Sequence, residues 1–577
     1  MGAIMNSTLR RAIGITVLTS VMFTGCTFGT SESKNDDSND LLTLDVFDVF
    51  ANYQGIQQGW FADVIRDKFN IELNIIAPNV SGNGSSLYDS RFAAGNLGDI
   101  IICGAENGQL GELVEAGLLL DMTDYIITQP SYSTYSSAII EMREAYDLNG
   151  IYALPIELSM GDASTSREGL APNYGNYLRW DYYKALGYPE INTLEDLPGI
   201  LASMQALAEK EYDEPVYAIS YFNDWNGNLL NIAKQQCCFY GYDEFGFVLM
   251  SADGSDYQNI LDRDSLYIRS LKFLNSCYRL GLVDPDSTSQ NYNDAYLKYC
   301  DGRVLYAPWP WISQDAFNVA ANLEQGKGYE FVPISDEKVY SYGCSNNGNQ
   351  RTFIAVGSKV KDPQRVVDFI AWLYSPEGIA ANEAGSSQSA AGPEDLTWTY
   401  TNNGPVLTEL GKEIFYNGDA DIPDDWGGLT WKDGISTLNV VTVNTVETDD
   451  YGYHYYYKMW DSVIPLAQSE IDKEWESKYR ENTVMKYLIA NDQLAVSPGV
   501  DFTEETRSTE LSSIQLQCSK IIVDYSQQMI YAEDDKEFYD LLQAMSDRAY
   551  VLGYETIYEF DLKNAMAKGE LIKKVLK

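Results

Sequence analysis

Short apolar runs alternate with amphipathic segments from residue 41 to residue 120, and this alternation limits the fold more than any other feature of the sequence. Three runs have the length and composition of buried strands: LLTLDVFDVF (41–50), IELNIIAP (71–78) and GDIIICG (98–104). Two segments have the pattern of helices: GWFADVIRDKF (59–69) and QLGELVEAGLLL (109–120), the second ending near Gly117. This β-α-β order predicts a parallel sheet with helices on both faces, and such sheets bind ligands at the carboxyl ends of their strands.

A later helix has clear start and stop signals. Asp362 is a good N-cap, Pro363 suits the first helical turn, and Pro376 with Gly378 closes the segment 361–378. Its apolar residues share one face: Val366, Phe369, Ile370 and Leu373. A predicted strand, RTFIAVG (351–357), comes directly before it, so the same α/β pattern returns late in the chain.

The length of 577 residues exceeds one ordinary domain, and we expect two or more lobes. Residues 380–460 are rich in Gly, Trp, Tyr and Asp and predict irregular structure, whereas 463–577 predicts mainly helices. The sequence contains 43 Tyr, whose flat apolar face and hydroxyl suit polar recognition surfaces. No internal repeat is evident, which disfavours a structural surface adhesin.

The first 26 residues have the composition of an export signal. Arg10 and Arg11 precede a short apolar core (12–23) that is too short to span a bilayer. FTGC (23–26) resembles the lipobox of bacterial lipoproteins, in which Cys26 becomes the lipidated, palmitate-bearing N-terminus after removal of residues 1–25. An ordinary secretory signal with a chance Cys is the alternative. The polar residues 27–40 that follow predict a disordered tether.

Charge and residue counts exclude several classes of site. The formal net charge of −44 repels nucleic acid and anionic lipid headgroups. The single histidine, His454, disfavours His-based metal clusters and Ser-His or Cys-His catalysis. Seven further cysteines are scattered without C-x-x-C spacing: Cys103, Cys237, Cys238, Cys277, Cys300, Cys344 and Cys518. We therefore expect no metal and no cofactor, and mostly free thiols.

Segments spread over residues 40–380 resemble, in their order, the extracellular solute-binding proteins of ABC transporters. The likeness is to the family of the maltose-binding proteins, and within it to the long lipoprotein branch of Gram-positive bacteria. The carrying segments are 98–126, GIYALPIE (150–157), LRWDYYKALGYPEINTLEDL (178–197), LGLVDPDS (280–287), GRVLYAPWPWIS (302–313) and 352–378, with 541–554 similar to the terminal helices of the long branch.

The resemblance implies an α/β fold of two lobes, of the type II periplasmic-binding-protein class, joined by a hinge around a central ligand cleft. One lobe would comprise 41–157 plus 334–378, and the second, larger lobe 158–333 plus 379–577. Some members of the branch hold calcium after a second-lobe helix. AEKEYDEPVYAIS (208–220) lacks the alternating acidic run of that loop, so we expect no such site here.

The second lobe supplies five candidate ligand contacts. In sugar-binding relatives the strand that resembles GRVLYAPWPWIS delivers a Trp to the cleft, which points to Trp309 and Trp311; burial of both in a core is the alternative. Sugar rings have C–H-rich faces that pack on aromatic rings, while their hydroxyls need polar partners. Trp225 lies among short amides, although 223–228 also fits a plain surface turn. Trp180 and Asp181 match a frequent cleft pair, unless Trp180 only caps a helix.

The first lobe supplies contacts at the ends of its strands. These are Asn52 and Tyr53 after the first strand, Glu106 and Asn107 after the third, Glu157 near the crossing into the second lobe, and Arg351. Glu157 also fits a purely hinge role. The aromatic run YGYHYYYKMW (451–460) fits either an enlarged site around His454 or a packed strand with aromatic cross-pairs.

The leading interpretation is a lipid-anchored, monomeric receptor on the extracellular side of the cell membrane. It would capture an oligosaccharide and deliver it to the permease of an ABC importer, without catalysis. A receptor of the same fold for peptides or other polar solutes is the first alternative. A secreted glycoside hydrolase is the second, and it would need two carboxyl groups roughly 5–9 Å apart across the scissile bond. No segment resembles a hydrolase motif.

Overall fold

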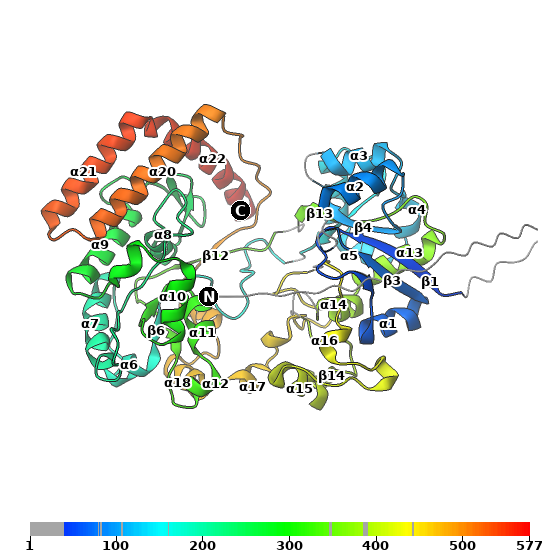
Figure 1. The fold of residues 1–577 in the computed structure, drawn as a ribbon, viewed down its shortest axis with the longest axis horizontal. Coiled ribbons are helices and arrows are strands. Elements are labelled where there is room, and N and C mark those ends of the chain that lie inside the picture. Colours follow the sequence, from blue (N-terminus) through cyan, green and yellow to red (C-terminus); the bar gives the residue numbers. More distant parts are fainter. Residues whose placement is uncertain are drawn as a thin grey trace, which may run out of the picture. The chain divides into compact units, whose positions relative to one another are not determined.

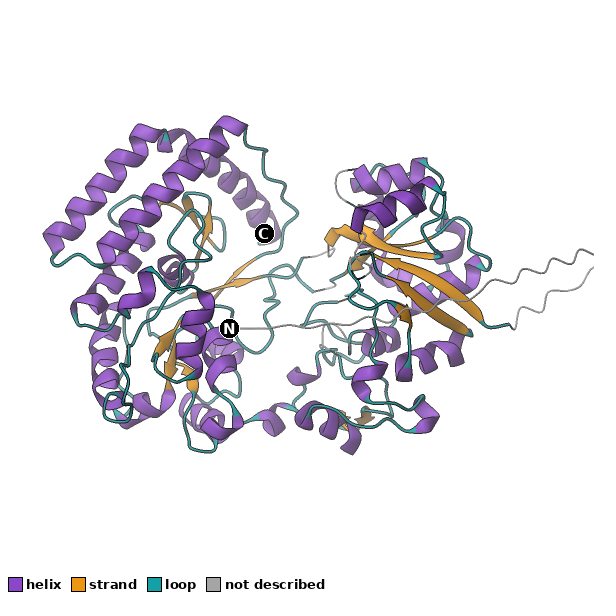
Figure 2. Cartoon of the chain, in the orientation of Figure 1, coloured by secondary structure: helices purple, strands orange, loops and turns teal. Residues whose placement is uncertain are grey.

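The computed structural model describes residues 40–577 except 79, 81–83, 106–107, 160, 346–348, 385–389 and 441–442. The leader, Cys26 and the tether therefore lie outside the described residues. Helices and strands alternate through the first part of the described chain and helices dominate the last (Figure 1); Figure 2 distinguishes the two kinds of element by colour.

The first sheet has six strands in the order β2-β3-β1-β4-β13-β5. Their bounds are β1 Leu42–Asp48, β2 Gly55–Ile56, β3 Ile71–Ile76, β4 Ile100–Gly104, β5 Leu154–Glu157 and β13 Asn349–Val356. β1 is parallel to β3 and β4, as predicted, while β13 runs antiparallel to both β4 and β5. The sheet is therefore mixed, because the chain re-enters it late, from the opposite direction.

Helices cover both faces of this sheet, as predicted. They are α1 Gly59–Phe69, α2 Gly84–Ala93, α3 Gln109–Glu115, α4 Thr123–Ile126, α5 Pro130–Ala145 and α13 Pro363–Leu373. Successive side chains of a strand point to opposite faces. Ile100 and Ile102 accordingly join one buried cluster with residues of α1, α4, α5 and α13, while Ile101 and Cys103 join another with residues of α3.

The helix predicted at 361–378 forms as two pieces. Asp362 caps α13, its carboxylate accepting a hydrogen bond from the Arg365 backbone N–H at 3.2 Å. α13 ends at Leu373, and Pro376 begins α14 (Pro376–Asn382) after a cap by Ser375. Pro376 thus starts a helix rather than closing one, since proline is well tolerated in a first turn.

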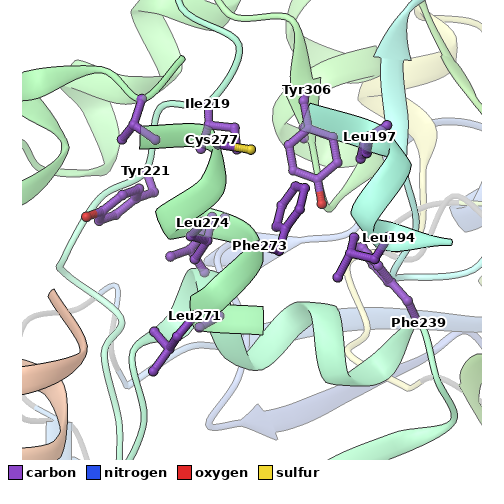
Figure 3. Close-up of a cluster of buried hydrophobic side chains, with 14 of the residues drawn as sticks. Leu194, Leu197, Ile219, Tyr221, Phe239, Leu271, Phe273, Leu274, Cys277 and Tyr306 are labelled. Atoms are coloured by element: carbon purple, nitrogen blue, oxygen red, sulfur yellow. The ribbon is translucent and has the colours of Figure 1, made fainter. Parts of the chain in front are cut away.

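A second core lies around small sheets and a ring of helices. The strands are β6 Tyr177–Arg179, β10 Tyr306–Ala307 and β11 Tyr329–Phe331 in one sheet, and β7 Tyr242–Phe245, β8 Val248–Ser251 and β9 Tyr257–Asn259 in another. The helices are α6 Trp180–Ala185, α7 Leu197–Ala208, α8 Asn231–Cys238, α9 Leu266–Arg279, α10 Tyr292–Cys300, α11 Pro310–Phe317 and α12 Ala320–Leu323, with short turns η2 Leu194–Asp196 and η3 Pro285–Thr288. Figure 3 shows Phe273 of α9 beside Tyr306 within this core, with Leu271 and Leu274 on the same helix.

The chain ends in three long helices that complete the second core. They are α20 Thr509–Ile530, α21 Asp535–Leu552 and α22 Tyr554–Val575, preceded by α17 Ile464–Ala467, α18 Glu470–Tyr479 and α19 Val484–Ala490. α20 packs against α9, α21 and α22. Ile522, Phe538 and Ile557 are fully buried in the same cluster as α9, which confirms the helical prediction for 463–577.

Described residues between 379 and 443 pack with the first core, although the sequence assigned this part of the chain to the second lobe. Ile379, Ile414 and Leu438 are buried with strands of the first sheet. Trp60 of α1 stacks on Trp431 at 4.5 Å and donates its indole N–H to the Trp431 carbonyl. The elements here are short: β14 Trp398–Thr401, β15 Gly404–Leu407, α15 Glu409–Asn417, α16 Trp431–Gly434, η4 Asp424–Trp426 and, further on, η5 Tyr457–Met459.

Three segments that connect the two cores are hydrogen-bonded to one another. β12 (Val339–Tyr342) pairs in parallel with β16 (Leu494–Ser497). The Gly343 N–H donates to the Ser497 carbonyl at 2.8 Å, and the Gly499 N–H donates to the Ala163 carbonyl at 3.1 Å. A side chain at Gly343 would meet the Ala163 carbonyl, so this close approach requires glycine.

The cysteines of the described residues are not paired in disulfide bonds. The seven cysteines outside the leader are free thiols, and all except the half-buried Cys300 are buried. Across the described ranges, no cluster of His, Cys, Asp or Glu has the geometry of a metal site. In that same part of the chain, no helix combines the length and the apolar character needed to cross a bilayer.

Glu337 gives a pH-dependent prediction. Its carboxyl is buried and accepts a hydrogen bond from Asn176 at 3.1 Å, and burial raises its pKa well above the ordinary value of 4.5. Folding therefore favours the protonated form, and stability is lost as pH rises from 4.5 through the raised folded-state pKa. Glu337→Gln should be more stable than wild type at neutral pH and equal to it near pH 4. Urea unfolding at several pH values tests this, and a pH-independent difference would contradict it.

Candidate functional site

The Trp309–Trp311 segment marks the transition from a strand to a helix. β10 ends at Ala307, Trp309 is in extended conformation at the N-cap of α11, and Pro310 opens that helix. The Ser313 hydroxyl donates to the Trp309 carbonyl at 2.7 Å and ties down the first turn. The two indoles stack at 4.9 Å with 30° between their planes. Proline thus ends strand pairing here and fixes the direction of both rings.

These indoles line a hollow of about 270 Å³ together with Trp225. Its other lining residues are Asn173, Tyr174, Asn231 and Gln235. Trp309 is 7% exposed, Trp311 is half-buried, and Trp225 is 51% exposed. Trp225 lies 5.5 Å from Trp311 and stacks on Tyr292 at 5.0 Å. The three indoles therefore form a supported aromatic wall, the outer part of which reaches solvent.

The polar residues of the hollow leave one acceptor without a partner. Gln235 is 5% exposed and its amide N–H donates to Asn231 Oδ1 at 2.6 Å. Within the described part of the chain, Gln235 Oε1 has no hydrogen-bond partner. None of the lining side chains is charged. A buried acceptor of this kind is costly unless it is paired, so the hollow suits a neutral ligand that offers hydroxyl donors and an apolar face.

Sequence reasoning brought Trp225, Trp309 and Trp311 forward, and the structure places all three in one hollow. Their contact with a ligand remains a prediction. Sequence reasoning missed Gln235 and Asn231. They lie one turn apart on α8, where NIAKQQCC carries no motif, and only the fold brings this face of the helix to the indoles.

Trp180 and Asp181 do not line the tryptophan hollow, and their contact with a ligand stays a prediction. Trp180 is fully buried in the second core, and its indole donates to Glu474 at 3.2 Å. Asp181 pairs bidentately with Arg179, whose side chain is 0% exposed, at 2.9 and 2.7 Å. Asp181 thus neutralises the buried Arg179 guanidinium at the start of α6, which would be costly to bury without a partner.

The first-sheet candidates lie away from the hollow. Asn52 and Tyr53 are exposed after β1, Glu157 is exposed at the end of β5, and Arg351 is exposed on β13. The Tyr53 hydroxyl donates to the Ile56 carbonyl at 2.6 Å. None of these four lines the tryptophan hollow. Glu106 and Asn107 lie outside the described residues.

A buried acid at the end of β1 was not anticipated. Asp48 is 0% exposed and accepts hydrogen bonds from the Phe50 N–H and from both the backbone and the side chain of Asn439. Burial raises the pKa of Asp48, and these hydrogen bonds oppose the shift. The carboxylate thus ties Asn439 to the end of β1.

Comparison with known proteins identifies the family. The sequence profile described as "Bacterial extracellular solute-binding protein" matches residues 62–387, more than half of the chain. No curated protein matches this sequence.

Solved structures share the fold. FusA, an ABC-transporter substrate-binding protein of S. pneumoniae solved in complex with kestose, has 14% identity and a TM-score of 0.50, covering 91% of this chain and 98% of its own. An extracellular solute-binding protein from Bifidobacterium longum subsp. infantis has 13% identity and a TM-score of 0.50, covering 92% and 98%.

These findings confirm the expected two-lobed α/β fold. They also agree with the absence of a hydrolase motif, because the family consists of substrate-binding proteins rather than enzymes. The chain belongs to the bacterial extracellular solute-binding proteins.

Proposed function

We propose that this protein captures a neutral oligosaccharide in the hollow lined by Trp225, Trp309, Trp311 and Gln235. The observation that carries the proposal is the combination of three indoles, an unpaired buried amide oxygen and no charged lining group. The apolar face of a sugar ring packs on indole, and its hydroxyls supply the donor that Gln235 Oε1 lacks. A charged solute would find no counter-ion among the residues that line the hollow.

The structural relatives support a sugar as the solute class. FusA was solved with kestose and, as a variant, with fructo-nystose, the latter structure having a TM-score of 0.50 and 12% identity to this chain. Both ligands are uncharged oligosaccharides, as the lining of the hollow requires. The similarity itself concerns the fold, and the choice of sugar rests on the side chains of this protein.

The first lobe would complete the site when the lobes close on the ligand. The connecting segments around Ser166, Gly343 and Gly499 are the proposed hinge, since they carry the chain between the two cores. We propose that the exposed first-lobe residues Asn52, Tyr53, Glu157 and Arg351, together with Glu106 and Asn107, supply polar contacts from the opposite side.

The receptor would work at the cell surface. We propose that Cys26 carries the lipid anchor on the extracellular side of the membrane, that 27–40 is the tether, and that the monomer delivers its ligand to the permease of an ABC importer.

Cys26→Ala should release the protein from membranes into the medium of an expressing bacterium, as measured by immunoblotting of the fractions. Retention of the variant on membranes would contradict lipidation at this residue.

Calorimetry with the full-length protein tests the function. Neutral oligosaccharides, uronate-containing oligosaccharides and peptides are titrated separately, and the mixtures are then assayed for new reducing ends. We expect saturable binding of a neutral oligosaccharide and no cleavage. Peptide binding without sugar binding would assign the protein to the alternative class of solute, and turnover would overturn the receptor function.

A further inference from the structure

A second cavity of about 190 Å³ is lined by described residues between 376 and 460, and its two tryptophans, Trp398 and Trp460, belong to a small buried cluster separate from the two large cores. It shares no lining residue with the tryptophan hollow. The aromatic run 451–460 forms turns and the short helix η5 rather than the strand considered from the sequence, and it contributes Tyr451, His454, Tyr455 and Trp460 to the cavity. No role follows for this cavity from capture of a neutral sugar at the other site.

Aromatic rings form walls of this cavity at steep angles to one another. Trp398 and Tyr400 have centroids 4.9 Å apart and planes at 78°, and Tyr400 and Tyr451 are 5.3 Å apart at 66°. Trp460 adds a further indole 5.4 Å from Trp398. The N–H of each indole is already used, by the Gly392 carbonyl for Trp398 and by the His454 carbonyl for Trp460. The rings thus offer faces rather than hydrogen bonds.

Carboxylates surround these walls. Glu377, Glu394, Asp449 and Asp450 line the cavity, and its only basic side chain is His454, whose Nδ1 lies 2.9 Å from the Val446 carbonyl oxygen. Glu377 pairs with Lys68 at 2.8 Å. For the other three acids, the described residues contain no Lys or Arg within ion-pair distance. Their charge is therefore largely uncompensated by the protein.

Asp449 is held in a fixed position. Its carboxylate accepts hydrogen bonds from the Tyr400 hydroxyl and from the backbone N–H groups of Tyr451 and Tyr453, each N–H at 2.9 Å. The Asp449 carboxylate is thus fixed beside the aromatic walls, and it needs no ligand to hold it there.

We propose that this cavity binds an organic ammonium cation, such as a quaternary amine or an alkylated amino group on a larger solute. Aromatic faces attract a cation through their quadrupole, and the neighbouring carboxylates strengthen the attraction. A hard inorganic cation needs several converging oxygen ligands, and no such cluster exists among the described residues. A weakly hydrated ammonium group bearing alkyl substituents satisfies both the apolar walls and the negative surroundings.

Choline and its neutral isostere 3,3-dimethyl-1-butanol test the proposal by calorimetry on the full-length protein. We expect saturable binding of choline, weakened by salt, and no binding of the isostere, because only the charge differs between them. Absence of choline binding, or equal binding of the two compounds, would overturn the proposal.

Variants then locate the binding site. Tyr451, 77% exposed, can be changed without disturbing the core, and Tyr451→Ala should weaken choline binding by roughly 2- to 5-fold. Asp450→Asn should also weaken it. Tyr550→Ala, a change at an exposed tyrosine on α21, and Trp225→Ala should both leave it unchanged. If Tyr451→Ala and Asp450→Asn leave choline binding intact, the cation binds elsewhere and the proposal fails. The sugar titrations are separate, so either proposal can fail alone.

Discussion

Asp181→Ala is expected to lower the free energy of unfolding by about 3–5 kcal/mol, the cost of stripping one partner from a buried ion pair. The Arg179 side chain is 0% exposed, and Asp181 neutralises it through two hydrogen bonds. The remaining guanidinium contacts include the Gly302 carbonyl at 2.7 Å, the Tyr212 hydroxyl at 3.4 Å and the faces of Phe317 at 4.3 Å and Tyr182 at 4.9 Å. None of these contacts carries a compensating charge, so the variant leaves a buried cation unpaired.

Asp301→Ala is the matched control. Asp301 pairs with Arg303 at 3.2 Å, but its side chain is 59% exposed, and such surface pairs contribute about 1 kcal/mol or less. Urea unfolding of both variants measures the difference. Equal, small losses would show that the Arg179–Asp181 pair is dispensable, and loss of sugar binding by folded Asp181→Ala would support its interpretation as a ligand contact.

Trp225→Ala and Trp311→Ala are expected to weaken oligosaccharide binding by about 1–3 kcal/mol each, roughly 5- to 150-fold in Kd, by analogy with the stacking of flat rings on aromatic side chains. Trp225 is 51% exposed, so its removal costs the fold little. Trp311 is half-buried between Trp309 and Trp225 and presents the centre of the wall. Calorimetry with the sugar identified from the panel gives both values.

Trp309 should behave differently from its neighbours. At 7% exposure it is largely a core residue, so Trp309→Ala should lower the free energy of unfolding by about 3–5 kcal/mol. The same variant should also weaken oligosaccharide binding. Trp426→Ala, a change at a half-buried Trp outside the hollow, serves as the control and should leave Kd unchanged. Unchanged affinity in Trp225→Ala and Trp311→Ala would exclude the aromatic wall as the sugar site.

The sequence predicted local elements well where periodicity and caps agreed. α1 occupies exactly the predicted 59–69, and Asp362 caps α13 as expected, because both signals lie within a few neighbouring residues. The mixed sheet could not be predicted in the same way. The direction of β13 depends on where the chain returns after passing through the second core, which is a long-range property.

The candidate site was predicted only in part, because some of its residues come together through long-range packing that the sequence does not show. Trp309 and Trp311 were brought forward by the resemblance of GRVLYAPWPWIS to a segment of sugar-binding relatives that delivers a Trp to the cleft. Trp180 and Asp181 were brought forward by resemblance too, yet Trp180 is buried in the second core, Asp181 pairs with Arg179, and neither lines the hollow. Gln235 became visible only when α8 was seen to pack beside the indoles, since an unpaired buried acceptor leaves no trace in the sequence.

A crystal structure of the full-length protein with the best-binding neutral oligosaccharide tests the central claim most directly. We expect a sugar ring stacked on Trp225 or Trp311, with a hydroxyl within hydrogen-bond distance of Gln235 Oε1. A sugar bound elsewhere, with this hollow filled only by water and Gln235 Oε1 paired to it, would contradict the account.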